Sequence, residues 1–554
     1  GEMLRRDVAQ GVRRGVQAVN SKTAVLIIGG GPVGLALAVE LGWRGIACTL
    51  VEQTDGTIST PKMNEVNVRT MEFCRRWGIA EAVQNCPFPA DYPVDVVFVT
   101  NLAGYELGRV PRAARNSAQP EPFSPARFQV CSQIWFDPIL RSFAGALATV
   151  ELLYRHRLED FEHSETGVVA RVVDLATGVS KRLAADYMVG CDGANSVVRA
   201  ALGIELVGAG TIGHPVHMFF RTPNLLERLG RAQGTFFFPV DRDGVWGSLR
   251  VIDPANGLWR LMVDDAGGAV TPQTVDRESY LRRALGCELD VDWLGVSIWH
   301  RRSVVAERYS RGRVFLAGDA VHQLSPTGAL GMNSGIGDAV DLGWKLAATI
   351  DGWGGPRLLS SYDAERRPIG ERNVKMATRF YHNLEEFGEV DGAIEHDSHE
   401  GETLRRRVGE RLVRDIGPEF WTIGLQIGYR YEDSPICLAD GTAAPPDTAE
   451  TYMPSARPGA RAPHAWLPDG RSILDLFGRG FVLLRFGDAP PCAELQAAAA
   501  SRGVPLTIET VDDPDTAELY QRRLVLVRPD GHVAWRSDSA PSDPERLIEQ
   551  VRGA

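Results

Sequence analysis

The chain has 554 residues, of which 44% are hydrophobic and 24% charged, and its formal net charge is −11. This length corresponds to roughly two to four domains, and the composition is that of an ordinary globular protein. The acidic balance argues against a generally basic nucleic-acid-binding surface. No run of about 18 uncharged apolar residues occurs, so no membrane span is expected.

Cysteine usage and the start of the chain indicate where such a protein works. The eight cysteines include no CxxC motif and no cluster with histidine at metal-site spacing, so we expect no bound metal and no disulfide framework. Reduced thiols are typical of a cytoplasmic protein. Residues 1–20 are rich in arginine but lack the apolar core of a signal peptide, and we interpret them as a basic leader.

The first predicted strand ends in a glycine-rich turn, because residues 27–34 read IIGGGPVG. In such a turn Gly29 permits the tight bend and Gly31 lets a pyrophosphate approach the backbone. Gly34 lets the following helix, residues 35–43, pack on the strand. The anion then binds at the helix N-terminus.

A second strand, residues 47–51, ends at Glu52. A carboxylate at this position can accept hydrogen bonds from the ribose hydroxyls of adenosine. The start of the chain therefore predicts an adenine dinucleotide site. NAD and FAD fit it equally, since both carry the same ribose and pyrophosphate.

Two later strands also stop at a glycine. Residues 189–193 read VGCDG and residues 313–319 read RVFLAGD, which delivers Asp319 to the carboxyl edge of the sheet. Ligands bind at this edge, and a carboxylate there can hydrogen-bond a ribityl hydroxyl, which favours FAD. The loop that follows has Gly328 and Gly331 ahead of an apolar helix, so its amides can lie against a flat ring.

Taken together, these motifs resemble the three fingerprints of the single-component FAD-dependent aromatic hydroxylases, the class A flavoprotein monooxygenases. They are GGGPVG (29–34), CDGANS (191–196) and AGDAVHQLSP (317–326). The third continues through GMN (331–333) and DAVDLGWKL (338–346), as in the phenol hydroxylase and polyketide hydroxylase branches. The resemblance covers residues 20 to 385, and the tail resembles the C-terminal extension of that branch.

The resemblance implies a cofactor, a reductant and a reaction. NADH or NADPH would reduce FAD, O₂ would add at the flavin C4a position, and the distal oxygen of the hydroperoxide would pass to a phenolic or other electron-rich aromatic ring. No separate nicotinamide-binding fold is visible in the sequence. The implied cofactor-binding residues are Gly29, Gly31, Gly34, Glu52, Gln133, Asp192, Gly193, Gly318, Asp319, Gly328, Gly331, Met332 and Asn333.

The acid or base of the reaction is not fixed by the motifs. By resemblance, Pro326 lies where the substrate meets the flavin. Members of this branch can carry an aspartate where this chain has Asn64, and an amide cannot take a proton at ordinary pH. Glu65, His217, water or an already ionised substrate remain as alternatives.

The spacing of the motifs predicts an α/β fold with a Rossmann-like FAD-binding domain assembled from separated segments. Strand-like aromatic runs between the second and third motifs predict an inserted antiparallel-sheet substrate domain, in which Phe237 and Trp246 are candidates for the pocket wall. The expected divisions are 21–205 and 301–385 for FAD binding, 206–300 for the substrate domain, 386–433 as a helical segment, 434–465 as a linker, and 466–554 as a thioredoxin-like domain.

The role of the last domain and the type of oxygenation stay open at this level. Cys492 has no neighbouring cysteine, so packing or homodimer formation is a simpler role for this domain than disulfide chemistry. Ring hydroxylation is the first hypothesis, and epoxidation or Baeyer–Villiger oxygenation on the same scaffold is the second. A flavin-binding interaction module is the non-enzyme alternative.

Overall fold

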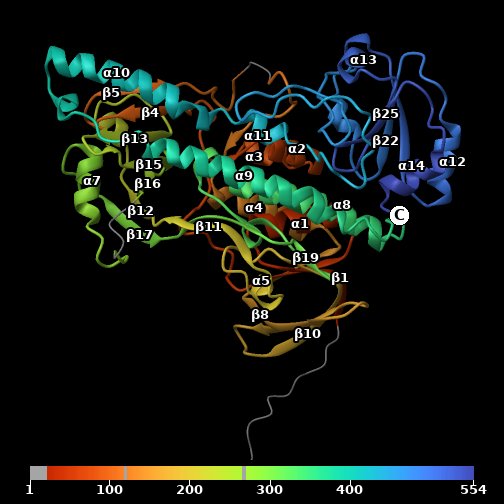
Figure 1. The fold of residues 1–554 in the computed structure, drawn as a ribbon. Helices are drawn as coiled ribbons and strands as arrows, with labels where there is room; N and C mark the ends of the chain where they lie inside the picture. Colours follow the sequence, from red (N-terminus) through yellow and green to blue (C-terminus); the bar gives the residue numbers. More distant parts are fainter. Residues whose placement is uncertain (1–20, 118–120, 265–269) are drawn as a thin grey trace, which may run out of the picture.

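A mostly parallel sheet forms the centre of the computed structural model, which describes residues 21–117, 121–264 and 270–554 (Figure 1). The predicted leader, residues 1–20, lies outside the described residues. The strand order is β19-β20-β10-β1-β2-β7, with the pair β8 and β9 continuing from β10. The strands are β1 (Ser21–Ile28), β2 (Cys48–Glu52), β7 (Val150–Tyr154), β8 (His156–His163), β9 (Val168–Asp174), β10 (Ser180–Gly190), β19 (Ser310–Arg311) and β20 (Val314–Leu316).

Three segments of the chain build this sheet, as the spacing of the motifs predicts. Strand β1 pairs in parallel with β2 and β10, and β10 pairs in parallel with β20. The carboxyl ends of β1, β10 and β20 therefore meet at one edge of the sheet. Apolar helices α1 (Pro32–Trp43) and α8 (Gly331–Ile350) pack against each other behind this edge.

A second large sheet, at the left in Figure 1, has the order β17-β12-β16-β15-β13-β4-β5, with β14 beside β13. The strand-like aromatic runs predicted between the second and third motifs are confirmed as strands of this sheet. However, residues 96–110, expected in the FAD-binding domain, add two strands to this sheet, because the wholly buried apolar run of β4 pairs with β13. The strands are β4 (Val96–Val99), β5 (Glu106–Val110), β12 (Val216–Arg221), β13 (Phe236–Asp241), β14 (Gly244–Val245), β15 (Gly247–Asp253), β16 (Leu258–Val263) and β17 (Asp292–Ile298).

Two small sheets connect the parallel sheet with the second large sheet. One contains β11 (Leu206–Gly213), β18 (Arg301–Ala306) and β21 (His322–Gln323), and the other β3 (Glu65–Val66) and β6 (Gln129–Val130). The remaining helices of this part are α2 (Val68–Trp77), α3 (Ala80–Gln84), α4 (Gln133–Ala146), α5 (Val197–Ala201), α6 (Leu225–Arg228), α7 (Arg277–Leu285), α9 (Ser361–Glu385), α10 (His399–Asp415) and α11 (Ile423–Ile427).

The C-terminal part is a four-stranded sheet of order β23-β22-β24-β25 with three helices, as expected for a thioredoxin-like unit. Its elements are β22 (Phe481–Phe486), β23 (Leu506–Val511), β24 (Leu524–Val527), β25 (Val533–Ser537), α12 (Ala493–Ser501), α13 (Pro514–Tyr520) and α14 (Pro544–Val551). Residues 434–465 before it contain isolated bridges but no helix and no strand.

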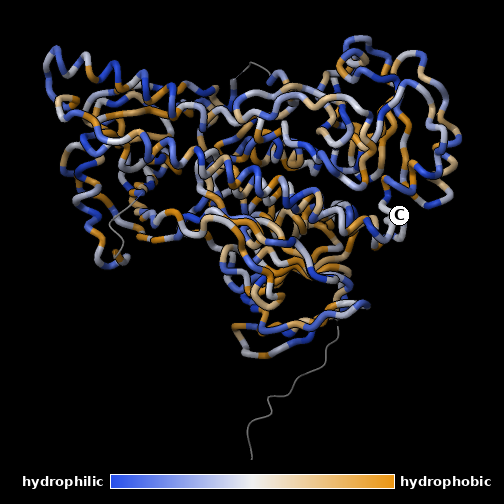
Figure 2. Tube along the Cα trace, in the orientation of Figure 1, coloured by the Kyte–Doolittle hydropathy of each residue, from blue (hydrophilic) through white to orange (hydrophobic). Residues whose placement is uncertain are grey.

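Hydrophobic residues gather along the central strands and helices (Figure 2). A separate cluster joins the C-terminal part to α8, where the ring of Trp344 stacks on Trp353 and meets the edge of Phe481 at 6.2 Å. Among the described residues, no helix has the length and apolar character needed to cross a membrane. Nor do they hold a group of three or more His, Cys, Asp or Glu side chains placed to bind a metal ion.

Candidate functional site

The turn between β1 and α1 is shaped to admit a ligand. Gly29 has a φ of 107°, and a Cβ there would lie 2.3 Å from the Cys191 carbonyl oxygen, so only glycine fits. At Gly31 an added Cβ would meet no atom within 4 Å, because this position faces open space. Gly31 is also the N-cap of α1, and no side chain caps the helix. Free backbone amides therefore point toward the open space.

Glu52 stands beside this turn, at the end of β2. Its carboxylate accepts hydrogen bonds of 2.7 Å from the backbone amides of Gly30 and Thr54. These two bonds fix the orientation of the carboxylate and leave further lone pairs on both oxygens free to accept. The geometry suits the predicted contact with ribose hydroxyls.

In the second fingerprint, Asp192 has a local structural task. Its two oxygens accept from the Ser196 hydroxyl at 2.5 Å and the Val198 amide at 3.1 Å, which secures the start of α5. Gly193 follows with a φ of 80°, and an added Cβ there would meet no atom within 4 Å. In this structure Gly193 therefore borders open space, whereas Asp192 supports the turn behind it.

The third fingerprint brings Asp319 to the same edge of the sheet. Asp319 lies in the short 3-10 helix η1 (Gly318–Ala320) and is exposed, although desolvation by the surrounding protein raises its pKa against the charges of His322 and Lys62. Water reaches the Asp319 side chain, although the surrounding protein partly desolvates it. The side chain therefore lines a concave surface. The backbone amide of Lys62 donates to Gln133 Oε1 at 3.0 Å, so three distant segments meet at this point.

Beyond Asp319, the loop from Pro326 leads into the uncapped N-terminus of α8. The loop contains the short 3-10 helix η2 (Thr327–Ala329), in which Gly328 has a φ of 78°. An added Cβ at Gly331 would meet no atom within 4 Å, and no side chain caps α8. Pro326 is exposed and Met332 is half-buried. The first amides of α8 are thus available to a ligand.

Asn333 anchors this helix start. Its Oδ1 accepts from the Asn67 amide at 3.0 Å and the Thr70 hydroxyl at 2.8 Å. Its Nδ2 donates to the carbonyl oxygens of Glu65 and Ala329. With these four bonds the Asn333 side chain is occupied, so only its backbone is left to contact a bound cofactor.

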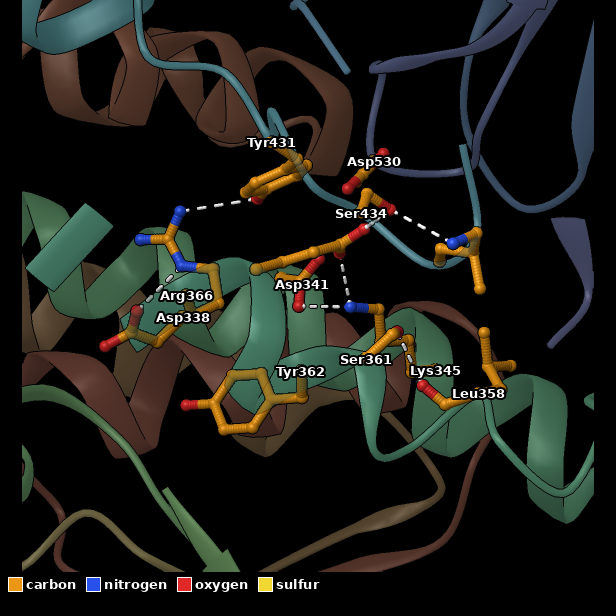
Figure 3. Close-up of polar contacts among 12 residues, drawn as sticks. Asp338, Asp341, Lys345, Leu358, Ser361, Tyr362, Arg366, Tyr431, Ser434 and Asp530 are labelled. Carbon is orange, nitrogen blue, oxygen red and sulfur yellow. Dashed lines mark hydrogen bonds and ion pairs between the residues drawn. The ribbon is translucent and has the colours of Figure 1, made fainter. Parts of the chain in front are cut away.

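Asp338, one turn further along α8, fixes the third fingerprint from behind. Its Oδ2 accepts from the Gly318 amide at 3.1 Å and lies 2.8 Å from His322 Nε2, and its Oδ1 accepts from Arg366 Nε at 2.8 Å. Figure 3 shows Arg366 reaching from α9 to Asp338 and to Tyr431. Burial alone would raise the pKa of Asp338, but His322 and Arg366 outweigh burial and lower it.

These features fit FAD. Two uncapped helix N-termini supply donors for its anionic groups, and the carboxylates of Glu52 and Asp319 supply acceptors for sugar hydroxyls. The Cβ positions of Gly31, Gly193 and Gly331 face open space. The loop that begins at Pro326 follows Asp319 in the chain and stays the predicted position of the flavin ring.

The face of the second sheet toward this loop carries arginines that the sequence reasoning missed. Strand pairing puts Arg250 beside Arg260 and Phe236, so these side chains share one face. Arg250 Nη2 donates to Glu65 Oε1 at 2.5 Å, and Arg112 donates to both Glu65 oxygens at 3.0 Å. Burial would raise the pKa of Glu65, but Arg112 and Arg250 lower it far below its usual range, so Glu65 cannot act as a base.

Arg260 differs from its neighbours because it has no hydrogen-bond or ion-pair partner in the described part of the chain. It is 6% exposed, its Nε is buried without a hydrogen bond, and no carboxylate of the described residues forms an ion pair with it. Desolvation and the charge of Arg250 lower its pKa to about 9, against the opposing charge of Asp264, which lies too far away for an ion pair, so Arg260 stays charged at neutral pH. A signal was available in the sequence, since both arginines stand between apolar residues of a strand.

The other predicted residues of this sheet have different surroundings. The buried His217 accepts a 2.8 Å hydrogen bond at Nε2 from Trp299 Nε1, and burial with the charges of Arg260 and Arg301 lowers its pKa well below the usual value. His217 is therefore a poor proton acceptor, because its Nε2 lone pair is already occupied and its surroundings disfavour the charged ring. Asn64 is buried, and its Oδ1 has no partner among the described residues.

Phe237 and Trp246 do not join the arginines. Phe237 pairs in register with Leu249 and lies 6.2 Å from the Trp259 ring, on the opposite face of the sheet. Trp246 stacks on Tyr280 of α7. The alternation of side chains along the strands directs the Phe237 ring into the core, and the Trp246 ring lies against α7. Their place in the pocket wall stays a prediction.

Two family models match this chain. Residues 22–377 match a family model described as an FAD binding domain, and residues 455–554 match one described as the aromatic-ring hydroxylase C-terminal domain. A tetracenomycin B2 monooxygenase-dioxygenase of Streptomyces olivaceus is 34% identical over 559 residues, covering 95% of this chain and 97% of the relative.

Two solved structures share the whole fold. RebC soaked with chromopyrrolic acid and holding 7-carboxy-K252c is 40% identical, with a TM-score of 0.89 over 96% of this chain and 99% of that chain. The flavin-dependent monooxygenase PieE, in complex with FAD and substrate, is 32% identical with a TM-score of 0.85, covering 96% of this chain and 98% of that chain.

Proposed function

This chain belongs to the FAD-dependent aromatic-ring hydroxylase family, and we propose that it hydroxylates a fused aromatic compound that carries a carboxylate group. FAD, reduced by NADH or NADPH, supplies the redox chemistry with O₂. The residues of this chain bind the cofactor, orient the aromatic substrate against its ring and balance the charges of both.

The unpaired guanidinium of Arg260 is the observation that carries the substrate class. A buried charge without a partner is costly, and in folded proteins such charges are paired or bind a ligand. Arg250 lies next to it in the sheet and Arg301 is a further nearby charge. A planar guanidinium suits two-point recognition of a carboxylate, so an anionic group on the substrate would complete this site.

The ligand of RebC supports the same class. That protein holds 7-carboxy-K252c, a carboxylated compound, on a chain 40% identical to this one. Phe236 and Phe219 stand next to Arg250 and Arg260 in the strand register, so aromatic side chains adjoin both arginines. A flat, mostly apolar ring system with one anionic edge would match both features.

A turnover assay tests the reaction. Purified, FAD-loaded protein is mixed with NADH or NADPH and a panel of fused aromatics, each offered with and without a carboxylate, while O₂ uptake and product mass are followed. We expect accelerated oxidation of the reductant and a product heavier by one oxygen atom, with a new ring hydroxyl in the NMR spectrum. An epoxide or a ring-expanded lactone would support the second hypothesis instead. No turnover with any compound would contradict the proposal.

The first prediction concerns Arg260→Gln. Because a hydrogen bond to a charged group contributes about 1.5–3 kcal/mol, we expect the dissociation constant of a carboxylated aromatic to rise about 10- to 150-fold. The dissociation constant of the matched compound without a carboxylate should change little. Fluorescence titration of the FAD-loaded protein measures both.

Arg242→Gln is the matched control, because Arg242 is an exposed arginine in the turn between β13 and β14 of the same sheet. This variant should bind both compounds like the wild type. Equal weakening of both compounds by Arg260→Gln would show a loss of packing rather than of charge recognition, and would contradict the proposed substrate class.

We further propose that the enzyme works in the cytoplasm and forms a homodimer. All eight cysteines are free thiols, which supports a reducing compartment. Light scattering of the purified protein gives the subunit number, and a mass equal to one chain would contradict the dimer.

A further inference from the structure

A buried glutamate that no motif singled out lies between the cofactor loop and the aromatic sheet. Glu419 belongs to the short 3-10 helix η4 (Gly417–Phe420), which packs against η2 of the loop after Pro326. The ring of its neighbour Phe420 lies 6.0 Å from Phe236 of β13 and 5.9 Å from Phe238. Glu419 is thus placed at the junction of the two surfaces proposed to hold cofactor and substrate.

The carboxyl group of Glu419 has no hydrogen-bond or ion-pair partner among residues 21–117, 121–264 and 270–554. The residue is 5% exposed, its Oε2 is buried without a hydrogen bond, and it forms no ion pair within the described part of the chain. The charged groups that face it are Asp264 at the end of β16, Arg301 of β18 and Glu65 of β3. Burial first, and then the negative charge of Asp264, raise its pKa to about 8, against the opposing charge of Arg301.

The other acids and bases of this region are committed elsewhere. Glu65 is held as a carboxylate by Arg112 and Arg250, and the neutral His217 is held by Trp299. Neither can take a proton near neutral pH, for the reasons given above. A buried carboxyl group without a partner among the described residues is costly to a fold, so its presence at this junction points to a ligand.

We propose that Glu419 is the catalytic base that takes the proton of a substrate hydroxyl group. The inference rests on the proposed ring hydroxylation and adds a residue to it. The O–H bond of the substrate breaks, the proton moves to a Glu419 oxygen, and the electron pair stays on the substrate oxygen, which enriches the ring in electrons. No oxidant or reductant takes part in this step.

The strength of the base matters for this transfer. A phenol has a pKa near 10, so a carboxylate with an ordinary pKa near 4.3 would be a poor acceptor, whereas one near 8 lies within roughly two units of the donor. Because the carboxylate is the active form, turnover should rise roughly tenfold from pH 7 to pH 9, as the group ionises.

The experiment compares Glu419→Gln with the wild type by two measurements. The first is infrared difference spectroscopy of the protein without substrate. We expect a protonated-carboxyl band that the variant lacks and that disappears as the pH rises through about 8. The second is turnover of a hydroxylated, carboxylated fused aromatic from the panel against pH. We expect the variant to be about 100-fold slower or more and to lose the rise between pH 7 and pH 9.

Two further variants interpret the result. Glu410→Gln changes an exposed glutamate of α10 and should leave both measurements unchanged. Glu419→Asp keeps the carboxyl group with a shorter reach and should recover part of the rate and the pH-dependent rise. FAD content and thermal melting show that each variant is folded.

The outcomes separate this inference from the proposed function. If the wild type hydroxylates the probe but Glu419→Gln keeps its rate and pH profile, Glu419 is not the base. A missing band, or one that titrates below pH 6, also overturns the inference. If the wild type hydroxylates no compound of the panel, the proposed function fails, and the role of Glu419 as its base fails with it.

Discussion

Carboxylates in this protein differ widely in proton affinity, because their neighbours differ. Burial acts on all of them, but Arg112 and Arg250 reverse its effect at Glu65, whereas Glu419 has no such partner. Asp319 is an intermediate case, since desolvation raises its pKa while His322 and Lys62 oppose the shift. Each carboxylate is therefore suited to a different task, as a structural anion, a proton acceptor or a cofactor ligand.

We predict that Asp319→Ala weakens FAD binding about 10- to 100-fold, because it removes a charge-assisted hydrogen bond to a hydroxyl group of FAD. Titration of flavin-free protein with FAD, followed by flavin fluorescence, measures the dissociation constant. Asp290→Ala, at an exposed position after α7, is the control and should bind FAD normally. Unchanged affinity in Asp319→Ala would remove this residue from the cofactor site.

Among the elements, the turn from β1 to α1 contains one glycine that folding requires and another that ligand binding requires. An added Cβ at Gly34 would lie 2.0 Å from the Gly29 carbonyl oxygen, whereas one at Gly31 would meet no atom within 4 Å. Gly34 is therefore needed for the packing of the helix on its strand. Gly31 keeps open the approach to the helix N-terminus.

We predict that Gly31→Ala lowers FAD affinity while the flavin-free protein loses less than about 1 kcal/mol of stability, the usual cost of an N-cap change. Gly34→Ala is the contrasting variant and should lose about 1–3 kcal/mol or more, because the helix must move. Thermal unfolding without FAD and FAD titration separate the two effects. Normal FAD binding by a folded Gly31→Ala protein would disprove the proposed phosphate approach.

In the whole molecule, buried charges tie the C-terminal part to the cofactor domain. Arg461 binds both oxygens of Glu72 on α2, and Arg69 donates to Glu72 at 2.8 Å and to the Asp530 carbonyl oxygen at 2.9 Å. In a second group, Lys345 of α8 and Arg528, which follows β24, share the carboxylates of Asp341 on α8 and Glu365 on α9. Asp341, Lys345 and Asp530 are labelled in Figure 3. The C-terminal part thus supports the two helices that back the cofactor edge.

This arrangement predicts acid sensitivity. Burial would raise the pKa of Glu72, but Arg461 and Arg69 lower it to about 2 in the folded protein. The unfolded value is near 4.3. The stabilisation is therefore fully present above about pH 5 and is lost as the pH falls toward 2, by roughly 3 kcal/mol for this group.

Urea unfolding between pH 6 and pH 3 checks this prediction. The unfolding free energy of the wild type should fall as the pH falls, and that of Glu72→Gln should start lower and fall less. Glu518→Gln, an exposed change on α13, should follow the wild type. Parallel curves for Glu72→Gln and the wild type would show that Glu72 does not carry the acid sensitivity.

Much of the fold could be predicted because its signals are local. The strand that ends at Gly29, the acid at Glu52 and the aromatic runs of β12, β13 and β16 each show within about ten residues. The strands β4 and β5 could not be assigned in this way. They join a sheet whose other strands lie more than 100 residues later, and no pattern within residues 96–110 indicates which strand they pair with.

The sequence by itself determined the family, the cofactor and the edge of the sheet where FAD is expected, since backbone turns and helix starts are encoded by neighbouring residues. Only the tertiary structure decided which charges are paired. Within the residues that the structure describes, it joined Glu65 to Arg112 and Arg250 and left Arg260 and Glu419 without partners. It also turned Phe237 into the core. Proton affinity and charge recognition depend on burial and on atoms a few ångströms away, and these come from segments that lie far apart in the chain.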